Sequence, residues 1–484
     1  MGSRKREVSE KLVRCIWLDQ CIKEDKLKTI EGEKVEIISP GWWNLEGGPD
    51  FKRAVIKISP ACRSLGAGRK DKTLRGDIEV HVYTSDWKAH GHHRDEKYEG
   101  TILHVVMWND RKKGIVRKKN GENISTLALK NFLSERLSKL KSQIKVEDYP
   151  HTSQGKGGFC PPNVRSKTPQ IIASILDSAG DKRLFLKSNR FEERLKGSTY
   201  DEVLYQGIME ALGYKKNKKE FLELSKRVSL ERIRRVLSSG REGLKVRRLQ
   251  ALFFGVCGLL PEETSENLDW ESKEYIRSLR SFWQKVEPNF NHRKMSNFQF
   301  QFGVRPANSP LRRIAGMTYL LVNCQKRGFF STFLSLFEKL REEEGKRKKR
   351  KEIREELKRL FIAKEGDYWI SRSFWGGRKG RPIRLIGEST ILNILVNIVI
   401  PIMLLFAKKK SRRALRRELL ELYADFPKLA PNNVTRFMCG QVFGQDKRKA
   451  SLINSARRQQ GLIHLYNQFC DHEERRCACC PLMK

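Results

Sequence analysis

The sequence predicts an α/β domain with a mixed sheet, followed by a mainly α-helical body. Short apolar segments that alternate with polar positions, the pattern of strands, occur before residue 148. Beyond residue 169 the apolar residues recur at helical spacing instead. We expect an α/β domain over 1–148, a linker rich in Gly, Pro and Ser over 149–169, a helical domain over 170–340 and a helical C-terminal domain over 341–484.

The α/β domain is predicted from one helix, four strands and a second helical stretch. In chain order these are Glu10–Cys21, the strands Val35–Ser39, Ala54–Ile58, Asp77–Tyr83 and Thr101–Trp108, and the helical stretch Ser125–Ile144. The fourth strand is nearly continuously apolar, as strands covered on both faces are. We therefore expect it inside the sheet.

Two segments of the helical body carry specific expectations. Asn308-Ser309-Pro310 supplies an N-cap and a first-turn proline for a helix that runs through Leu321. The segment Arg341–Phe361 is charged nearly all round, so we expect a helix that is exposed to solvent or lies along phosphates.

One apolar segment, Ile391–Ala407, has the composition of a membrane span. It is at the short end of the usual length and contains Asn393, Asn397 and Pro401. We expect a buried helix that bends at Pro401, with a membrane span as the alternative, and therefore no membrane as partner.

The charge of the chain indicates a polyanionic partner. It has 98 Lys and Arg against 57 Asp and Glu, a net charge of +41. Such a surplus destabilises a compact chain unless a polyanion neutralises it, and phosphate backbones are the usual polyanion. We expect nucleic acid as the partner, with DNA weakly favoured over RNA; an acidic membrane or ribosome-like surface is the alternative. The basic segments are Arg63–Lys72, Lys112–Lys119, Lys215–Lys219, Lys346–Lys351 and Lys408–Arg417.

Aromatic residues alternate with cations between Phe282 and Phe302, and this pattern has two interpretations. The rings, Trp283, Phe290, Phe298 and Phe300, can stack on unpaired bases. They can equally pack in a core, which is the commoner use of large apolar side chains.

The cellular compartment is inferred from the N-terminus and the cysteines. The first fifteen residues are basic and have no apolar core, so they do not form a secretory signal. The eleven cysteines are then expected to be reduced, in a cytoplasmic protein.

Two carboxylates are expected to converge in the α/β domain. Asp50 lies at a turn that leads into a strand, and Glu79 lies in the strand Asp77–Tyr83 with His81 on the same face. If these strands pair, Asp50 and Glu79 can bind one Mg²⁺ or Mn²⁺. That cation would polarise a phosphodiester and help to generate the attacking hydroxide.

These residues resemble the PD-(D/E)XK nuclease motif. Gly48-Pro49-Asp50 followed by Glu79-Val80-His81 matches its pattern, with His81 in place of the usual lysine. The resemblance implies that Asp50 and Glu79 bind metal, that position 81 orients the nucleophilic water, and that Glu10 on the first helix assists. Unlike lysine, an unperturbed histidine is mostly neutral near pH 7.

A second resemblance covers most of the chain. The sequences GGPDF, GDIEVHV, SDWKAHGHHRDEKYEGTILHVV, RRQQGLIHLYNQFC and CACCP are similar to those of an uncharacterised bacterial family, a domain of unknown function. This resemblance implies no established activity.

Five of the nine histidines, His81, His90, His92, His93 and His104, lie within 24 residues. His90, His92 and His93 share a polar loop with Asp95, and we expect this loop to contact substrate beside the carboxylates. Metal ligation is the alternative. His104 lies in an apolar strand, where a hydrogen-bonded core histidine is expected.

The C-terminal cysteines predict a metal site. Cys470, Cys477 and Cys480 have six and then two intervening residues, and Cys439 is the candidate fourth ligand. Four thiolates can bind Zn²⁺ or a [4Fe–4S] cluster. The spacing resembles that of helix-hairpin-helix DNA glycosylases and of iron–sulfur nucleases that carry PD-(D/E)XK cores, so we favour the cluster; reduced unligated thiols are the third alternative.

The function that the sequence predicts is a metal-dependent nuclease. The alternatives are a non-catalytic nucleic-acid-binding protein with a structural Fe–S or Zn²⁺ site, and another metal-dependent hydrolase. The sequence contains no G-x-x-x-x-G-K-[ST] motif, so a helicase activity would have to come from a protein partner.

A first prediction concerns the cysteines. Protein isolated anaerobically should be brown and absorb in the charge-transfer region of iron–sulfur clusters, because the four thiolates would hold [4Fe–4S]. An absorbance spectrum with metal analysis measures this. A colourless protein with stoichiometric zinc would contradict the prediction.

Overall fold

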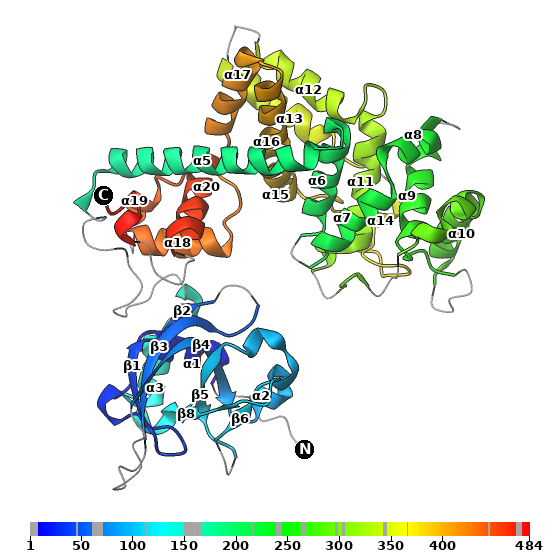
Figure 1. The fold of residues 1–484 in the computed structure, drawn as a ribbon. Helices are drawn as coiled ribbons and strands as arrows, with labels where there is room; N and C mark the ends of the chain where they lie inside the picture. Colours follow the sequence, from blue (N-terminus) through cyan, green and yellow to red (C-terminus); the bar gives the residue numbers. More distant parts are fainter. Residues whose placement is uncertain are drawn as a thin grey trace. The chain divides into compact units, whose positions relative to one another are not determined.

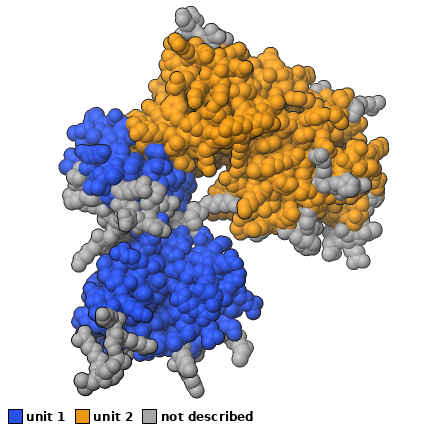
Figure 2. All heavy atoms as spheres, in the orientation of Figure 1, with its two compact units in different colours: residues 1–175, 431–452, 462–484 blue, residues 176–430, 453–461 orange. Residues whose placement is uncertain are grey.

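The computed structural model divides the chain into two compact units (Figures 1 and 2). Unit 1 comprises Met1–Ile175, Pro431–Leu452 and Leu462–Lys484, and unit 2 comprises Leu176–Ala430 and Ile453–Gly461. The structure describes residues 8–44, 47–60, 71–111, 114–149, 160, 164, 166–214, 216–238, 244–262, 268–295, 299–302, 305–341, 346–364, 366–443, 446–470 and 477–484.

Unit 1 contains a mixed six-stranded sheet in the order β1-β3-β4-β5-β8, with β2 paired to β3. The pairs β1/β3, β2/β3 and β3/β4 are antiparallel, and β4/β5 and β5/β8 are parallel. The interior position expected for the strand Thr101–Trp108 is confirmed, because β5 pairs on both sides. The strands are β1 Lys34–Ser39, β2 Trp42–Trp43, β3 Phe51–Ser59, β4 Lys72–Tyr83, β5 Thr101–Trp108 and β8 Thr126–Ala128.

Helix α1 (Glu10–Leu18) packs against β4 (Figure 1). It begins where the Ser9 side chain accepts a hydrogen bond from the backbone N–H of Leu12, and its apolar side is buried in the same core as Ile78 and Val80. The helix ends three residues before the predicted end at Cys21. Its polar side faces Asp50, the residue directly before β3, through Arg14.

The prediction of a helical stretch over Ser125–Ile144 was wrong for its first half. Residues 126–128 form β8, a 3₁₀ turn follows at Leu129–Phe132, and only α3 (Leu137–Gln143) is helical. Pairing with β5 buries Thr126 and Leu127 completely. Short apolar runs fit both periods, and here the tertiary pairing decides. Three further short elements complete the domain: α2 Asp86–Ala89, β6 Val116–Arg117 and β7 Asn123–Ile124.

Unit 2 is mainly helical around one large apolar core. The predicted helix over 308–321 is confirmed as α11, with Pro310 in its first turn. The highly charged segment is also a helix, α13, but Ile353 and Leu357 are fully buried, so it has an apolar face. The principal helices are α5 Pro169–Leu195, α6 Tyr200–Leu212, α7 Lys218–Arg227, α8 Leu230–Ser238, α9 Lys245–Val256, α10 Trp270–Val286, α11 Pro310–Cys324, α12 Phe329–Glu338, α13 Lys346–Arg359, α14 Tyr368–Ser371 and α17 Arg413–Ala424.

The apolar segment around Pro401 is a core helix of unit 2. Helix α15 (Glu388–Ile394) continues through a π turn (Leu395–Val399) into α16 (Ile400–Lys409). By length and composition this helix can cross a membrane, but 67% of its most apolar stretch is buried inside the protein. Proline has no backbone N–H to donate to the preceding helical turn. The π turn Leu395–Val399, in which the helix is wider, ends two residues before Pro401.

The tight packing of β4 generates a prediction. Gly76→Ala should lower the free energy of unfolding by about 1–3 kcal/mol. The added methyl carbon would lie 2.4 Å from Ile102 Cγ2 and 2.6 Å from the carbonyl oxygen of Gly100, and that backbone oxygen cannot move aside easily. Urea denaturation measures the loss. As a control, Gly47→Ala meets nothing within 4 Å and should change stability by less than about 0.5 kcal/mol. Equal stabilities for the two variants would contradict this packing.

Candidate functional site

Asp50 and Glu79 lie side by side in unit 1, because β3 and β4 pair as expected. The backbone N–H of Asp50 donates to Glu79 Oε2 (3.0 Å), and the backbone N–H of Val80 donates to Asp50 Oδ2 (3.1 Å). Both side chains are buried, with 6% and 4% of the residue exposed. Each strand thus holds the carboxylate of the other in place.

A β-bulge adjoins this pair. The register between β3 and β4 shifts between Phe51 and Ala54, and Arg53 has a left-handed backbone with φ +59°. Asp77 stabilises the bulge, since its carboxylate accepts from the backbone N–H of Arg53 (3.2 Å) and pairs with Lys52 Nζ (2.6 Å). Bulges of this kind turn the end of a strand and recur beside functional sites.

Helix α1 contributes an acid and a base to the pair. Arg14 Nη2 lies 2.8 Å from Asp50 Oδ1, and Glu10 is 3.7 Å from the same guanidinium nitrogen. Glu10, predicted from the nuclease resemblance, therefore lies at the site. Sequence reasoning missed Arg14, although Glu10 and Arg14 are four residues apart and so share one face of the predicted helix.

Burial dominates the electrostatics of the carboxylates. It raises the pKa of Asp50 to about 8, with repulsion from Glu79 adding to the shift and Arg14 opposing it. Burial also raises the pKa of Glu79 to about 8, opposed by its hydrogen bond from the Asp50 backbone and by Arg14. The pair therefore retains proton near neutral pH unless another positive charge is supplied.

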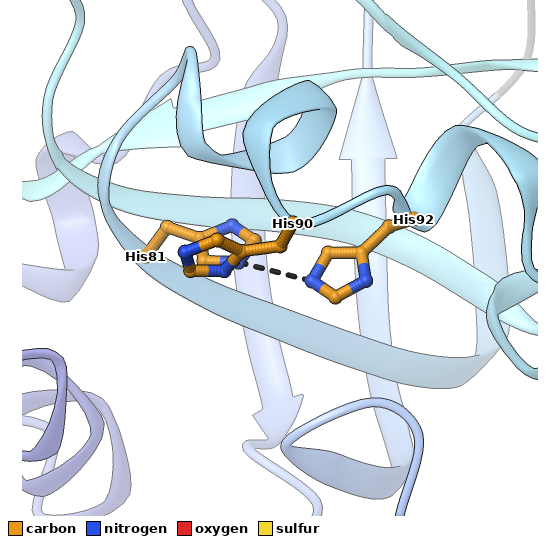
Figure 3. A group of neighbouring side chains, drawn as sticks. All are labelled: His81, His90 and His92. Carbon is orange, nitrogen blue, oxygen red and sulfur yellow. Dashed lines mark hydrogen bonds between the residues drawn. The ribbon is translucent and has the colours of Figure 1, made fainter. Parts of the chain in front are cut away.

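Three histidines, His81, His90 and His92, lie close together (Figure 3), next to the carboxylates of Glu79 and Glu10. His81 Nε2 lies 3.1 Å from His90 Nδ1 and 3.2 Å from His92 Nε2. Glu79 Oε1 is 3.1 Å from His92 Nε2 and 3.4 Å from His81 Nε2. Glu10 Oε1 is 3.9 Å from His81 Nε2 and 3.8 Å from His90 Nδ1, and this buried oxygen has no hydrogen-bond partner.

A chain of hydrogen bonds orients His81 through Nδ1, the ring nitrogen that does not face His90 and His92. Its Nδ1 lies 2.9 Å from His104 Nε2, and His104 Nδ1 lies 3.3 Å from Thr126 Oγ1. His104 is the core histidine that the sequence predicts, and burial lowers its pKa to about 3. Burial likewise lowers the pKa of His81 far below its usual value, and that of His92. Neutral imidazoles with one nitrogen held from behind are typical of metal ligands.

Aromatic rings hold the histidine loop. His92 stacks on Tyr98 with ring centroids 3.8 Å apart, and Trp87 packs edge-on against His92 (5.5 Å) and His104 (5.3 Å). Trp87 Nε1 also donates to the carbonyl of Arg117 (2.9 Å). Sequence reasoning missed both aromatic residues, whose only signal was their place in the histidine-rich motif.

The other two predicted loop residues lie outside this group. The Asp95 carboxylate accepts from the backbone N–H of Lys97 (3.0 Å) and caps a 3₁₀ turn at Glu96–Tyr98. His93 is partly exposed and is not among the three grouped histidines. The ligand atoms of His81, His90 and His92 all lie within 4.8 Å of one another.

The candidate cysteine ligands occupy the C-terminal part of unit 1. Cys439 lies on α18 (Asn433–Phe443), Cys470 ends a π turn (Tyr466–Cys470), and Cys480 N–H donates to the Cys477 carbonyl (2.9 Å). No three described cysteine sulfurs form a group within 4.8 Å. Cys160, which the sequence leaves isolated, donates its backbone N–H to the carbonyl of Gln441 on α18 (2.8 Å).

The predicted binding segments are only partly described. Arg63–Lys72 lies mostly outside the described residues, as do Lys112, Lys113, Lys215 and Phe298. The other three aromatic residues that were candidates for base stacking belong to the core of unit 2. They are Trp283, Phe290 and Phe300, which are only 4–6% exposed. Packing, not base stacking, accounts for these three rings.

The fold and the site define a class of protein. Its mixed sheet carries a histidine–carboxylate group, made up of His81, His90, His92, Glu79 and Glu10, and is joined to a large helical unit. Residues 10–432 match the family described as "Protein of unknown function (DUF2851)", and the chain belongs to this family. The match confirms the resemblance to an uncharacterised family. No curated protein and no solved structure is detectably similar to the chain.

The aromatic support of the histidine loop generates a prediction. Trp87→Ala should lower the free energy of unfolding by about 3–5 kcal/mol, because the indole is 2% exposed and its removal leaves a cavity beside His92 and His104. Trp87→Phe keeps an aromatic ring and should lose less. Urea denaturation of the three proteins measures the order. Unchanged stability in Trp87→Ala would show that the loop does not depend on this ring.

Proposed function

We propose that this protein is a metal-dependent nuclease whose catalytic centre is the histidine–carboxylate group of unit 1. The observation that carries the proposal is the convergence of the His81, His90 and His92 imidazoles with the carboxylates of Glu10 and Glu79. These side chains come from α1, from β4 and from the loop after β4. The net charge of +41 supports a phosphodiester polymer as substrate over a small phosphorylated metabolite.

Several interatomic distances are close to those of a transition-metal site. Zinc–nitrogen bonds are about 2.0–2.1 Å, so ligand atoms at the corners of a tetrahedron lie about 3.4 Å apart. His81 Nε2 lies 3.1 Å from His90 Nδ1, 3.2 Å from His92 Nε2 and 3.4 Å from Glu79 Oε1, and His92 Nε2 lies 3.1 Å from Glu79 Oε1. Glu79 is not part of the group of three imidazoles whose ligand atoms all lie within 4.8 Å, so His90 and Glu79 would have to move closer together to share one ion. Imidazole ligands suit Zn²⁺ or Fe²⁺ better than Mg²⁺ and Mn²⁺, which prefer oxygen.

A cation also resolves the hydrogen bonding of the group. A neutral imidazole nitrogen carries either one proton or one lone pair, so His81 Nε2 cannot satisfy both His90 and His92. If His81 donates Nδ1–H to His104, its Nε2 lone pair is directed at the centre of the group. The three lone pairs and the Glu79 oxygen would then all be satisfied by one cation.

The chain supplies the groups for hydrolysis around that cation. A bound divalent metal polarises a phosphodiester and makes water a stronger nucleophile at neutral pH. Glu10 Oε1, unpartnered beside His81 and His90, is placed to accept the proton of the attacking water. The water oxygen would bond to phosphorus as the ester P–O bond breaks, and Glu10 would pass the proton taken from the water to the leaving oxygen.

The resemblance to PD-(D/E)XK nucleases remains part of the proposal. In that motif Asp50 and Glu79 would together bind Mg²⁺ or Mn²⁺. In the described arrangement both oxygens of Asp50 are engaged, by Arg14 and by the Val80 N–H. We therefore assign Asp50 to positioning Glu79 through its backbone N–H, and Glu79 to binding metal. The [4Fe–4S] or Zn²⁺ site at the cysteines is proposed as a separate structural centre.

One observation favours a second candidate function. Glu79 and His81 are 4% and 1% exposed, so a substrate would reach the group only past the more exposed Glu10 and His90. This burial suits a structural metal site in a nucleic-acid-binding protein without catalysis.

The decisive experiment is cleavage of labelled single-stranded DNA, duplex DNA and RNA with Mg²⁺, Mn²⁺ or Zn²⁺. Glu79→Gln and His90→Ala should each reduce cleavage and the affinity for Zn²⁺ or Mn²⁺ at least about 100-fold, because each removes a ligand. Asp50→Asn should also reduce cleavage, because the loss of its charge weakens the contact with Arg14 that fixes Asp50, whose backbone N–H holds Glu79. Gel assays and equilibrium dialysis measure the two quantities.

His93→Ala is the matched control, since His93 adjoins His92 but lies outside the group. It should retain metal affinity and cleavage within about twofold. If wild-type protein binds metal and nucleic acid but cuts no substrate, the group is structural and the binding protein is the correct function. Retained cleavage in Glu79→Gln would refute the assignment of the site.

A further inference from the structure

Unit 2 contains a polar pocket of about 640 Å³. Most of its lining residues lie on or next to the helices α9, α10, α11 and α14, which are labelled in Figure 1. It belongs wholly to unit 2, whereas the histidine–carboxylate group belongs to unit 1. Its lining combines aromatic rings with cations, which is the combination that binds nucleotides: rings for the base and cations for the phosphate.

The aromatic part of the pocket has one exposed and one buried component. Trp270 is 78% exposed, the highest value among the large apolar side chains that the structure describes. Tyr275 and Tyr368 stack with centroids 4.4 Å apart and planes 9° from parallel. Their hydroxyls are engaged by Gln250 and Ser272. A tryptophan this exposed leaves a large ring face in water, where stacking on a base would cover it.

The pocket is lined by three cations and three carboxylates, and they differ in how they are paired. Arg247, Lys326 and Lys364 line it and are all exposed, and no ion pair joins them to a described carboxylate. Arg247 instead lies over the Tyr275 ring, 5.8 Å from its centroid. Two of the lining carboxylates are paired with cations, Glu271 with Arg372 and Lys379 and Glu274 with Arg277, while the third, Asp367, accepts hydrogen bonds from neutral donors.

Buried polar contacts hold the walls of this pocket rigid. Asp367 accepts from Tyr319 Oη (2.8 Å), Gln250 Nε2 (3.2 Å) and the Trp369 backbone N–H (2.9 Å). Arg312, 1% exposed, donates to five carbonyls, those of Trp369, Ile370, Arg372, Ile383 and Arg384. A wall fixed in this way exists before a ligand arrives, which lowers the entropic cost of binding.

We propose that this pocket binds one nucleotide unit, with the base stacked on Trp270 and the phosphate held by Lys326, Lys364 and Arg247. The unit can belong to an unpaired nucleic-acid strand or to a free mononucleotide. The pocket would place a substrate strand on unit 2, but it does not depend on the proposed nuclease activity.

Binding is measured in EDTA, so that cleavage cannot occur. The probes are fluorescein-labelled oligo(dT) by anisotropy and unlabelled mononucleotides by calorimetry, each with the full-length protein. Trp270→Ala and Lys326→Glu should each weaken binding at least about fivefold, and Trp270→Phe should restore most of the affinity. Trp270 is exposed, so its truncation leaves the fold intact; circular dichroism checks this.

Two matched variants in unit 2 serve as controls. Tyr214→Ala removes an aromatic side chain that is 64% exposed, and Lys226→Glu reverses an exposed charge, both outside the pocket lining. Each should change affinity less than about twofold. Loss of oligonucleotide binding only in the pocket variants assigns the site to an unpaired strand, and loss of mononucleotide binding alone assigns it to a free nucleotide. If Trp270→Ala binds both probes like wild type, the proposal is wrong.

Discussion

The α/β domain depends on reciprocal hydrogen bonds between Asp50, directly before β3, and the middle of β4. Asp50 donates its backbone N–H to Glu79, while Val80 donates its backbone N–H to Asp50. Each carboxylate is therefore held by the strand opposite, in a core that would otherwise exclude it. The bulge at Arg53, the polar side of α1 and the histidine loop all adjoin this exchange.

Burial of so many polar groups needs compensation, and the domain compensates in two ways. Arg14 supplies a positive charge against Asp50, and raised carboxyl pKa values limit the negative charge. Burial lowers the pKa values of His81, His92 and His104, which favours their neutral forms. The result is a compact group of lone pairs with little net charge, in which a divalent cation would replace protons and not disturb a balanced ion pair.

Much of this arrangement could be predicted from local sequence, and the rest depends on tertiary contacts. The pairing of Asp50 with Glu79 followed from strand periodicity, and His104 from its apolar strand. The loop with His90 and His92 was expected beside the carboxylates, but its direct contacts with His81 and Glu79 depend on stacking against Tyr98 and Trp87, which the sequence pattern does not show. Thr126 was assigned to a helix, since a three-residue strand carries too little period to distinguish the two.

The five carbonyls held by Arg312 have a consequence for how unit 2 tolerates change. The segment around Trp369–Arg384 has little regular structure, so one guanidinium takes the place of a sheet or helix ladder. A lysine has one nitrogen and cannot span acceptors that far apart, so the exchange of one cation for the other is not conservative here. Length changes within this segment would draw its ends away from a shared anchor, which makes an apparently irregular loop one of the least adaptable parts of the chain.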